Sequence, residues 1–372
     1  MKRRLAAAVA ALATAACSSS GGPTPAPLPE LANPKEIRLL WSADAGSGGN
    51  FTFFPALTSE AIYVAARDGG VTRLDPANGR ERWRADAERQ LSGGVGADAR
   101  TVAVATEEGE VIALDAASGK VRWRARASSE VLTPPTVGAG LVLVRTIDSR
   151  IFAFDAEDGK RRWVYQRAPG SLILRVATGV SILGDTAFAG FSGGKLVAVS
   201  LSNGAQRWEA TVAVPKGANE LERVADVVGE PALTGREVCA ASYQGRVACF
   251  EADSGKQIWG RELSSVTGVS VDARYAFVAD ERGAVHAFDR TNGASVWKQD
   301  KLANRQLSLP RATGALVAVG DFEGEIHFLD RDSGNFVARY SARGGAVRAA
   351  PLVLPSGLLI QTQDGSLYAL SP

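Results

Sequence analysis

A unit that recurs along the chain constrains the fold more than any other feature of this sequence. Each unit has an apolar run, a short turn with glycine, a second apolar run ending at an anchor residue, then a glycine and usually a tryptophan. Residues 101–123 and 141–163 are two clear copies. The anchors, 38 to 51 residues apart, are Asp75, Asp115, Asp155, Ser200, Glu251, Asp289 and Asp330. Repetition at about 40 residues is typical of solenoids and β-propellers.

The residue types within one unit predict four β-strands. In residues 101–115 two β-branched, apolar runs flank Glu-Glu-Gly, which favours a hairpin. The glycine four residues after the anchor supplies a left-handed turn position, and the next strand carries the tryptophan, which can fill the space between sheets. A shorter strand, often with proline, precedes the hairpin, where proline is tolerated at a strand start or edge. Four antiparallel strands make one propeller blade.

The eighth unit is divided between the two ends of the sequence. Residues 357–372 supply a hairpin without a tryptophan strand, and residues 35–44 supply a strand-like segment with a tryptophan. Pairing the early segment into the last blade would close the ring and remove an open sheet edge. We therefore predict an all-β fold, an eight-bladed β-propeller over residues 35–372. The blade-sealing tryptophans would be Trp41, Trp83, Trp123, Trp163, Trp208, Trp259 and Trp297.

The first segment has the layout of a bacterial lipoprotein signal. Residues 1–16 have a basic start, a short apolar run and small residues before Cys17. This pattern predicts cleavage before Cys17 and lipid attachment to it, with an ordinary secretory signal as the alternative. Residues 17–34, rich in Ser, Gly and Pro, predict a flexible tether. Ser18 follows Cys17 directly, and a serine there resembles lipoproteins that are sorted to the outer membrane. We therefore expect a lipid-anchored protein on the periplasmic face of the outer membrane.

Composition excludes several classes of function. The formal net charge is only +2, and three of the positive charges lie in residues 1–16, so nucleic-acid binding is not expected. Two histidines and three cysteines without a CxxC motif leave few zinc ligands. His286 and His327 occupy a position where other units have Ile or Phe, which indicates packing rather than catalysis. Cys239 and Cys249 flank a turn and could form a cross-strand disulfide or remain two small buried side chains.

The anchor–Gly–Trp pattern resembles the repeat of quinoprotein dehydrogenases, which are eight-bladed and bind pyrroloquinoline quinone over the channel. Enzymes of that family usually carry two adjacent cysteines and a calcium ion held by acidic and amide groups. This sequence has no adjacent cysteines, and each tryptophan already has a place in a blade. We therefore expect no catalytic residues, no metal and no cofactor. A periplasmic quinoprotein-like dehydrogenase or a ligand-binding propeller is the alternative.

Two consecutive units are longer than the others. The additional residues follow Trp163 and Trp208, so the two extended connections would lie on one face of neighbouring blades. Long loops on a rigid scaffold commonly bind partners. The first connection offers apolar anchors beside a guanidinium, and the second offers charged side chains. The candidate partner-binding residues are Leu172, Leu174, Arg175, Glu222, Arg223 and Asp226.

The lipoprotein signal, the tether, the repeat and both long connections resemble the BamB family, lipoproteins of the outer-membrane β-barrel assembly machinery. The segments that carry the resemblance are SLILR, ELERVADV, ASYQGRVACFEADSGKQIW, VGDFEGEIHFLDRDSGNFVAR and LLIQTQDGSLYAL. The resemblance implies docking on periplasmic POTRA domains of BamA through Leu172, Leu174, Arg175 and Asp226. It also implies help in inserting β-barrel proteins into the outer membrane, and contact with these client chains while they are still unfolded is a further possible interaction. Val228 departs from the family pattern, which has a second acid there.

Overall fold

All regular elements of the described residues are β-strands. The computed structural model describes residues 23–168, 170, 172–176 and 178–372. Within this part of the chain, thirty-two strands form eight four-stranded antiparallel sheets. No helix in the described part is long and apolar enough to cross a bilayer.

From inner to outer strand, the first four sheets are β2 (Ala56–Leu57), β3 (Ile62–Ala65), β4 (Gly70–Leu74) and β5 (Glu81–Asp86); β6 (Gly96–Ala97), β7 (Thr101–Ala105), β8 (Glu110–Asp115) and β9 (Val121–Arg126); β10 (Thr136–Gly138), β11 (Leu141–Thr146), β12 (Arg150–Asp155) and β13 (Arg161–Gln166); and β14 (Val180–Leu183), β15 (Thr186–Phe191), β16 (Lys195–Ser200) and β17 (Gln206–Thr211). The other four are β18 (Val227–Thr234), β19 (Glu237–Ser242), β20 (Arg246–Glu251) and β21 (Gln257–Glu262); β22 (Ser270–Val271), β23 (Tyr275–Ala279), β24 (Val285–Asp289) and β25 (Ser295–Gln299); β26 (Arg311–Thr313), β27 (Leu316–Gly320), β28 (Glu325–Asp330) and β29 (Phe336–Ser341); and β30 (Leu352–Leu354), β31 (Gly357–Gln361), β32 (Ser366–Ser371) and β1 (Arg38–Asp44).

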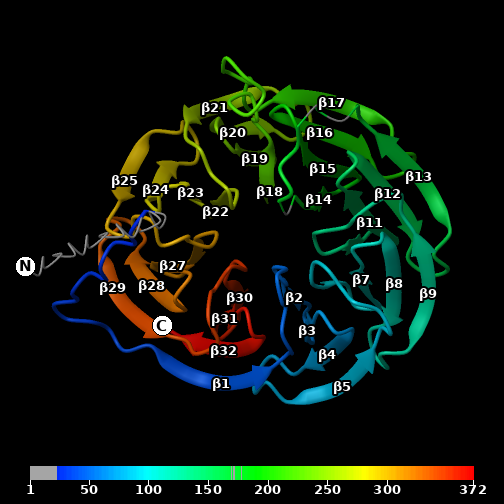
Figure 1. Cartoon of the computed structure of the whole chain (residues 1–372), viewed down its shortest axis with the longest axis horizontal. Helices are drawn as coiled ribbons and strands as arrows, with labels where there is room; N and C mark the ends of the chain where they lie inside the picture. The colour runs from blue at the N-terminus through cyan, green and yellow to red at the C-terminus, as the bar shows by residue number, and fades with distance from the viewer. Residues whose placement is uncertain (1–22, 169, 171, 177) are drawn as a thin grey trace, which may run out of the picture.

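The eight sheets stand around a central axis, with the short strands inside and the tryptophan strands at the rim (Figure 1). The predicted eight-bladed propeller is therefore confirmed. Its two middle strands per blade are almost wholly buried, as in β7 and β8, because both of their faces pack against neighbouring blades. The core is consequently a circle of inter-blade clusters rather than a single centre.

Ring closure also follows the prediction. The first strand, β1, pairs antiparallel with β32, so that Trp41 lies opposite Ala369. Trp41 is buried and packs with Ile62 of the next blade and Leu359 of its own blade. The two ends of the propeller segment thus complete one sheet, in which β32 is paired on both sides, with β31 and with β1.

The repeated glycine has a function beyond its turn. Gly119 adopts φ +72°, and a Cβ at this position would lie 2.8 Å from the indole of Trp83 in the preceding blade. The Trp83 Nε1 donates a hydrogen bond of 3.1 Å to the carbonyl of Ala116 in the same turn. The same Trp–Gly contact recurs at Gly79, Gly159, Gly204, Gly255, Gly293 and Gly334. Each tryptophan therefore seals its blade against the glycine turn of the next one.

This contact explains the unit that lacks tryptophan. Ala338 on β29 occupies the tryptophan position. The blade that follows is the split one, in which β32 and β1 are not joined by a turn, so it offers no glycine for a tryptophan to cover. Ala338 is instead fully buried in a cluster with Tyr340 and Tyr368.

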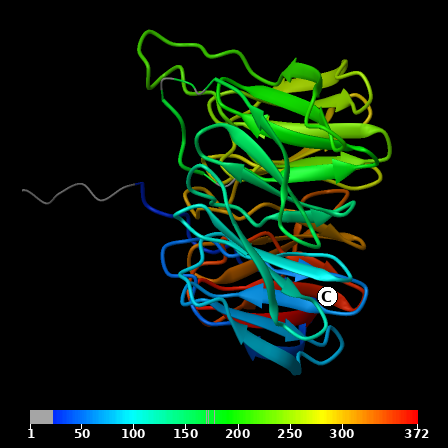
Figure 2. The ribbon, with the colours of Figure 1, turned by 90° about the vertical axis from the view of Figure 1, so that its right-hand side faces the viewer.

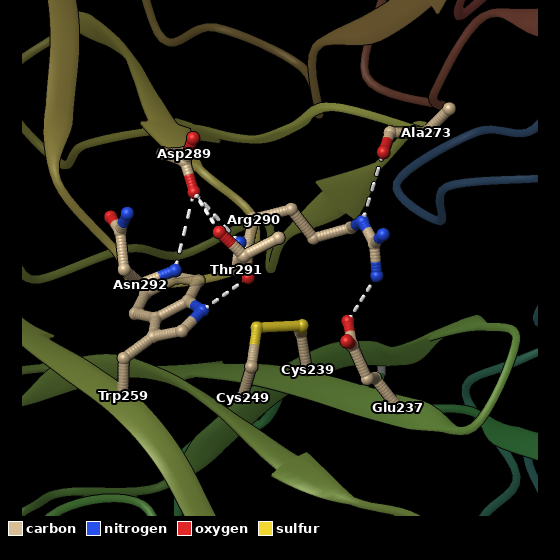
Figure 3. The surroundings of a disulfide bond; sticks show 9 residues. All are labelled: Glu237, Cys239, Cys249, Trp259, Ala273, Asp289, Arg290, Thr291 and Asn292. Atoms are coloured by element: carbon tan, nitrogen blue, oxygen red, sulfur yellow. Dashed lines mark hydrogen bonds and ion pairs between the residues drawn. A yellow bond between two sulfur atoms is a disulfide. The ribbon is translucent and has the colours of Figure 1, made fainter.

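Cys239 and Cys249 lie directly opposite each other on β19 and β20 and form a disulfide (Figure 3). Both are fully buried beside Trp259. We expect replacement of both by alanine to lower the free energy of unfolding by about 2–4 kcal/mol, since the unfolded chain gains freedom and small cavities form. Denaturant unfolding with and without reductant measures the effect. Reductant should lower the free energy of unfolding of the parent and leave that of the double alanine variant unaltered. A parent whose free energy of unfolding does not respond to full reduction would contradict the prediction.

Candidate partner-binding surface

The two long connections lie where the repeat spacing predicts them. Residues 167–179 join β13 to β14, and residues 212–226 join β17 to β18. Both run from an outer strand to the next inner strand, so they share the face on which all such connections lie. We call this the loop-bearing face; the opposite face carries the glycine turns. The connection in residues 212–226 projects well beyond the ring in the side view (Figure 2).

A buried carboxylate joins the two connections. The backbone N–H of Leu174 donates to Asp226 Oδ2 at 2.8 Å, and the N–H of Gly193 donates to Asp226 Oδ1 at 3.2 Å. Asp226 is only 4% exposed. Burial raises the pKa of the Asp226 carboxyl, while both N–H donors and the nearby Arg145 charge act against that rise. Asp226 therefore holds the backbone of the first connection from its buried side, and the Asp226 carboxylate does not face solvent.

Arg145 on β11 supports the same region from the other side. Its guanidinium donates a hydrogen bond to Thr178 near the end of the first connection and lies over the Phe191 ring, 4.9 Å from the centroid. Burial lowers the pKa of Arg145 to about 10, with Asp226 and Asp148 opposing the shift. The first connection thus rests on two enclosed groups of opposite charge.

Arg175 points away from the second connection and towards the early blades. It donates to Glu130 Oε2 at 3.0 Å and to Glu107 Oε1 at 2.6 Å. Phe51 lies beneath the cluster, 4.3 Å from the Arg67 guanidinium and 5.8 Å from that of Arg175. The hydrogen bond with Glu130 is the main cause of a raised pKa for Arg175. Because its side chain remains 55% exposed, Arg175 is both held in place and accessible.

Exposed apolar side chains stand on both connections. Leu172 is 42% exposed, whereas Leu174 is half-buried. In the second connection Val214 is 62% exposed and Leu221 is 71% exposed. Val214 and Leu221 are not among the residues predicted from the sequence, although an apolar residue among the charged residues of a long loop is a usable signal. Such side chains are suited to binding a partner.

Glu222 and Arg223 maintain the shape of the second connection. The Glu222 carboxylate accepts hydrogen bonds from the N–H of Ala218 at 2.7 Å and from the Asn219 amide at 2.8 Å. Arg223 Nε donates to the carbonyl of Gly217 at 3.0 Å. The structure therefore brings these two residues to a turn within residues 217–223, which presents Leu221 to solvent.

Val228 lies within β18, is buried, and pairs with Ala241 of β19. Glu230 follows in the irregular part of the same strand and accepts a hydrogen bond of 3.1 Å from Ser181 on the neighbouring inner strand. Glu230 thus faces the inner strands and does not replace the missing acid on the loop-bearing face.

The two histidines serve the turns of their blades. His286 Nε2 lies 2.9 Å from Asp280, and His327 Nε2 lies 3.0 Å from Asp321, the same contact in consecutive blades. His327 is fully buried. Within residues 23–372, apart from the three positions that the structure leaves undescribed, no three His, Cys, Asp or Glu side chains gather as a metal site would require. Cys17, the expected lipidation site, lies outside the described residues.

The fold and this surface define a class: a PQQ-like-repeat β-propeller whose elaborated part is a pair of connected loops. A family model described as "Outer membrane protein assembly factor BamB" matches residues 38–299. Proteins of that name from Burkholderia pseudomallei and Pseudomonas aeruginosa are 40% and 45% identical, covering 99% and 96% of this chain and 97% and 96% of their own. The chain belongs to the BamB family of outer-membrane protein assembly factors.

Solved structures agree with this assignment. BamB from Moraxella catarrhalis superposes with a TM-score of 0.82 at 27% identity, covering 91% of this chain and all of that one. A quinohemoprotein alcohol dehydrogenase from Comamonas testosteroni superposes with a TM-score of 0.69 at 14% identity, covering 90% and 76%. The second likeness concerns the fold alone. It shows that the same ring accommodates enzymes, so function must be argued from the loops.

Proposed function

We propose that this protein is a non-enzymatic scaffold, anchored by lipid on the periplasmic face of the outer membrane, that docks on POTRA domains of BamA and assists β-barrel insertion. The observation that carries the proposal is the connected pair of loops. Asp226 joins them below, while Leu172 and Arg175 stand exposed above. An apolar side chain beside a fork-shaped donor is the composition of a binding hot spot.

The internal contacts of Arg175 favour specific docking of one partner over non-specific binding. Glu107 and Glu130 hold the guanidinium in one orientation, so little side-chain entropy is lost when a partner binds. Leu221 lies on a turn that Glu222 and Arg223 hold in shape, and it offers a second apolar anchor on the same face. A partner that spans both connections would therefore meet preformed contacts.

Affinity purification from detergent-solubilised outer membranes tests the proposed function. We expect the tagged protein to recover the assembly machinery, with BamA as its direct contact. Calorimetry with the isolated POTRA domains of the same organism then measures binding without other subunits. Failure of both experiments with folded protein would contradict the proposal.

Replacing the expected lipidation site tests the anchor. We expect Cys17→Ser to abolish lipid labelling and to release the protein from the membrane fraction, or to leave its precursor uncleaved, because serine lacks the thiol that receives the lipid. Fractionation and metabolic labelling with a fatty-acid analogue measure both results. Unaltered labelling and membrane association would refute the proposed anchor.

A further inference from the structure

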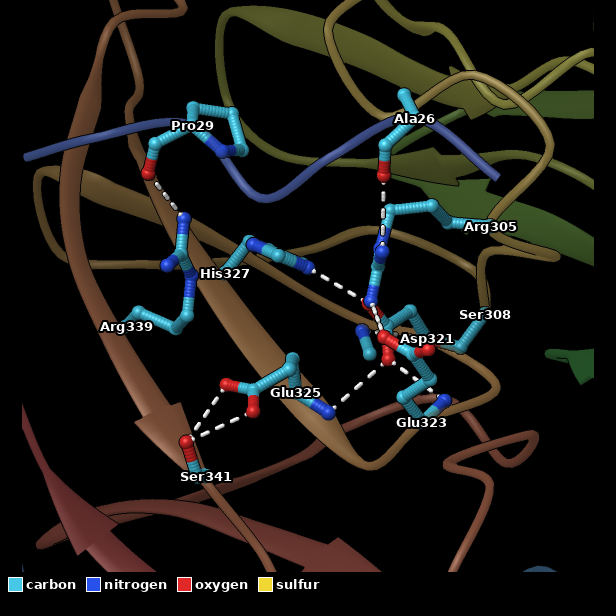
Figure 4. A network of polar contacts seen from close by, with 11 residues as sticks. Ala26, Pro29, Arg305, Ser308, Asp321, Glu323, Glu325, His327, Arg339 and Ser341 are labelled. Carbon is cyan, nitrogen blue, oxygen red and sulfur yellow. Dashed lines mark hydrogen bonds and ion pairs between the residues drawn. The ribbon is translucent and has the colours of Figure 1, made fainter. Parts of the chain in front are cut away.

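Part of the tether is seated on the propeller. The N–H of Ala26 donates to the carbonyl of Ala303 at 2.9 Å, and the N–H of Lys35 donates to the carbonyl of Val337 at 2.9 Å. Between these points, side chains of the blade β26–β29 and its leading connection bind carbonyls of the tether (Figure 4). We call residues 24–35 the strap. Its composition predicts flexibility, but long-range contacts hold it in place.

The seat is built from arginines with fixed positions. Arg305 donates to the carbonyl of Ala26 at 3.0 Å, and Arg339 donates to the carbonyl of Pro29 at 2.6 Å. Arg305 is 2% exposed and is fixed by Asp321 at 2.6 Å and by Glu323. Because these acids orient the guanidinium before the strap arrives, the seat is preorganised.

The strap suits such a seat. Prolines alternate with other residues over 23–29, which restricts the backbone of the free segment and leaves its carbonyls available as acceptors. The side chain of Asn304 donates to the carbonyl of Thr24 at 3.0 Å. Carbonyls of Thr24, Ala26 and Pro29 are thus each bound by a different side chain.

The strap begins on the loop-bearing face. Residues 303–305 belong to the connection from β25 to β26, which has the same topology as the two long connections. The side view places the start of the described chain on the same side of the ring as residues 212–226 (Figure 2). From there the strap passes outside β29 and enters β1 (Figure 1).

We propose that the strap turns the loop-bearing face of the propeller towards the membrane. Seven peptide units separate Cys17 from Thr24, which allow at most about 25 Å, whereas an unseated tether would extend to Lys35 and allow roughly 65 Å. The seat therefore fixes both the height of the ring and the face that looks at the bilayer. This inference rests on the proposed lipid attachment at Cys17.

Proteolysis in solution tests whether the strap is seated. Glu30 is an exposed cleavage site within the strap. In the chain from Cys17 onward we expect Arg339→Ala to accelerate cleavage after Glu30 by about tenfold, since one charge-assisted hydrogen bond is lost. Arg343→Ala, which removes an exposed arginine that does not touch the strap, is the control and should leave the rate unaltered. Equal cleavage of the parent and Arg339→Ala would show that the strap is not held there.

Energy transfer to a membrane tests the orientation. The free thiol of Cys17 is coupled to maleimide lipid in phosphatidylcholine vesicles that contain an acceptor lipid. A fluorescent amino acid at position 216, in the connection that leads into β18, reports the loop-bearing face. One at position 256, in the turn between β20 and β21 of the same blade, reports the opposite face. We expect stronger energy transfer from position 216 than from position 256. The label at 216 should lie about 20 Å closer to the membrane, which is the length of a six-residue strand.

A released strap provides the matched comparison. Arg339→Ala combined with replacement of residues 23–29 by an equally long Gly-Ser sequence should abolish the difference between positions 216 and 256. Equal transfer in the parent, or a difference that persists after release, would overturn the inference. Chemical coupling makes the result independent of lipid attachment in the cell and of BamA, so failure here leaves the proposed function standing.

Discussion

Deleting residues 35–44 is expected to destabilise the entire ring. The deletion removes β1, and with it all pairing between β1 and β32 and the buried Trp41. Trp41 Nε1 also donates to the carbonyl of Pro76 at 3.2 Å, and its ring covers Gly79 of the next blade. Loss of a buried tryptophan alone costs about 3–5 kcal/mol, against a total stability of about 5–15 kcal/mol for a typical domain.

Thermal and denaturant unfolding followed by circular dichroism measure this effect. A chain that lacks residues 23–34 is the matched control, because it loses a segment of similar length and keeps β1. We expect the control to unfold near the parent and the deletion of residues 35–44 to unfold at much lower denaturant concentration or to aggregate. Coincident unfolding curves for all three proteins would show that closure does not depend on β1.

Arg175→Glu and Asp226→Ala are both expected to weaken binding to the POTRA domains about thirtyfold, which corresponds to about 2 kcal/mol. Their physical reasons differ. Arg175→Glu brings a third carboxylate to Glu107 and Glu130 and removes an exposed donor. Asp226→Ala releases the N–H groups of Leu174 and Gly193, so the first connection loses its attachment. Calorimetry measures binding, and circular dichroism verifies that each variant is folded.

Two further variants separate direct contact from positioning. Glu107→Gln combined with Glu130→Gln leaves Arg175 in place but weakens its internal contacts. If Arg175 touches the partner, this double variant should bind within about threefold of the parent, whereas a purely internal role predicts a loss like that of Arg175→Glu. Arg236→Glu, at an exposed ion pair with Asp253 on the opposite face, is the control. Parent-like binding by both Arg175→Glu and Asp226→Ala would place the interface elsewhere.

The blades could be predicted from the sequence because one local pattern repeats. Anchor, glycine and tryptophan keep fixed offsets, so strand identity, blade number and ring closure follow from spacing alone. The partner of each glycine could not be predicted in the same way. Gly119 was interpreted as a turn residue, and its contact with Trp83 in the preceding blade becomes evident only when the blades are packed together.

The positions of the two long connections could be predicted from the sequence, but the contacts within them could not. Spacing places both long connections on neighbouring blades, and Leu174 indeed meets Asp226. No local pattern indicates that the Asp226 carboxylate is buried, or that Arg175 contacts Glu107, 68 positions away. Such pairs depend on how loops from different blades fold over one another. The seat of the strap escaped prediction for the same reason, since Arg305 and Ala26 are 279 positions apart.

The split blade imposes an order of events on synthesis. Strand β1 lies near the beginning of the propeller segment, yet its only partner strand, β32, ends at Ser371. Seven blades can form as the chain emerges, but the eighth must wait until almost the last residue is available. Until then β1 lacks its partner strand, and the blades at both ends of the growing ring expose apolar faces. The final pairing joins the most distant parts of the propeller segment, so we expect it to be a slow step of folding. A chain of this design is vulnerable to misassembly until its last strand is available, and premature truncation at its end would leave an open ring.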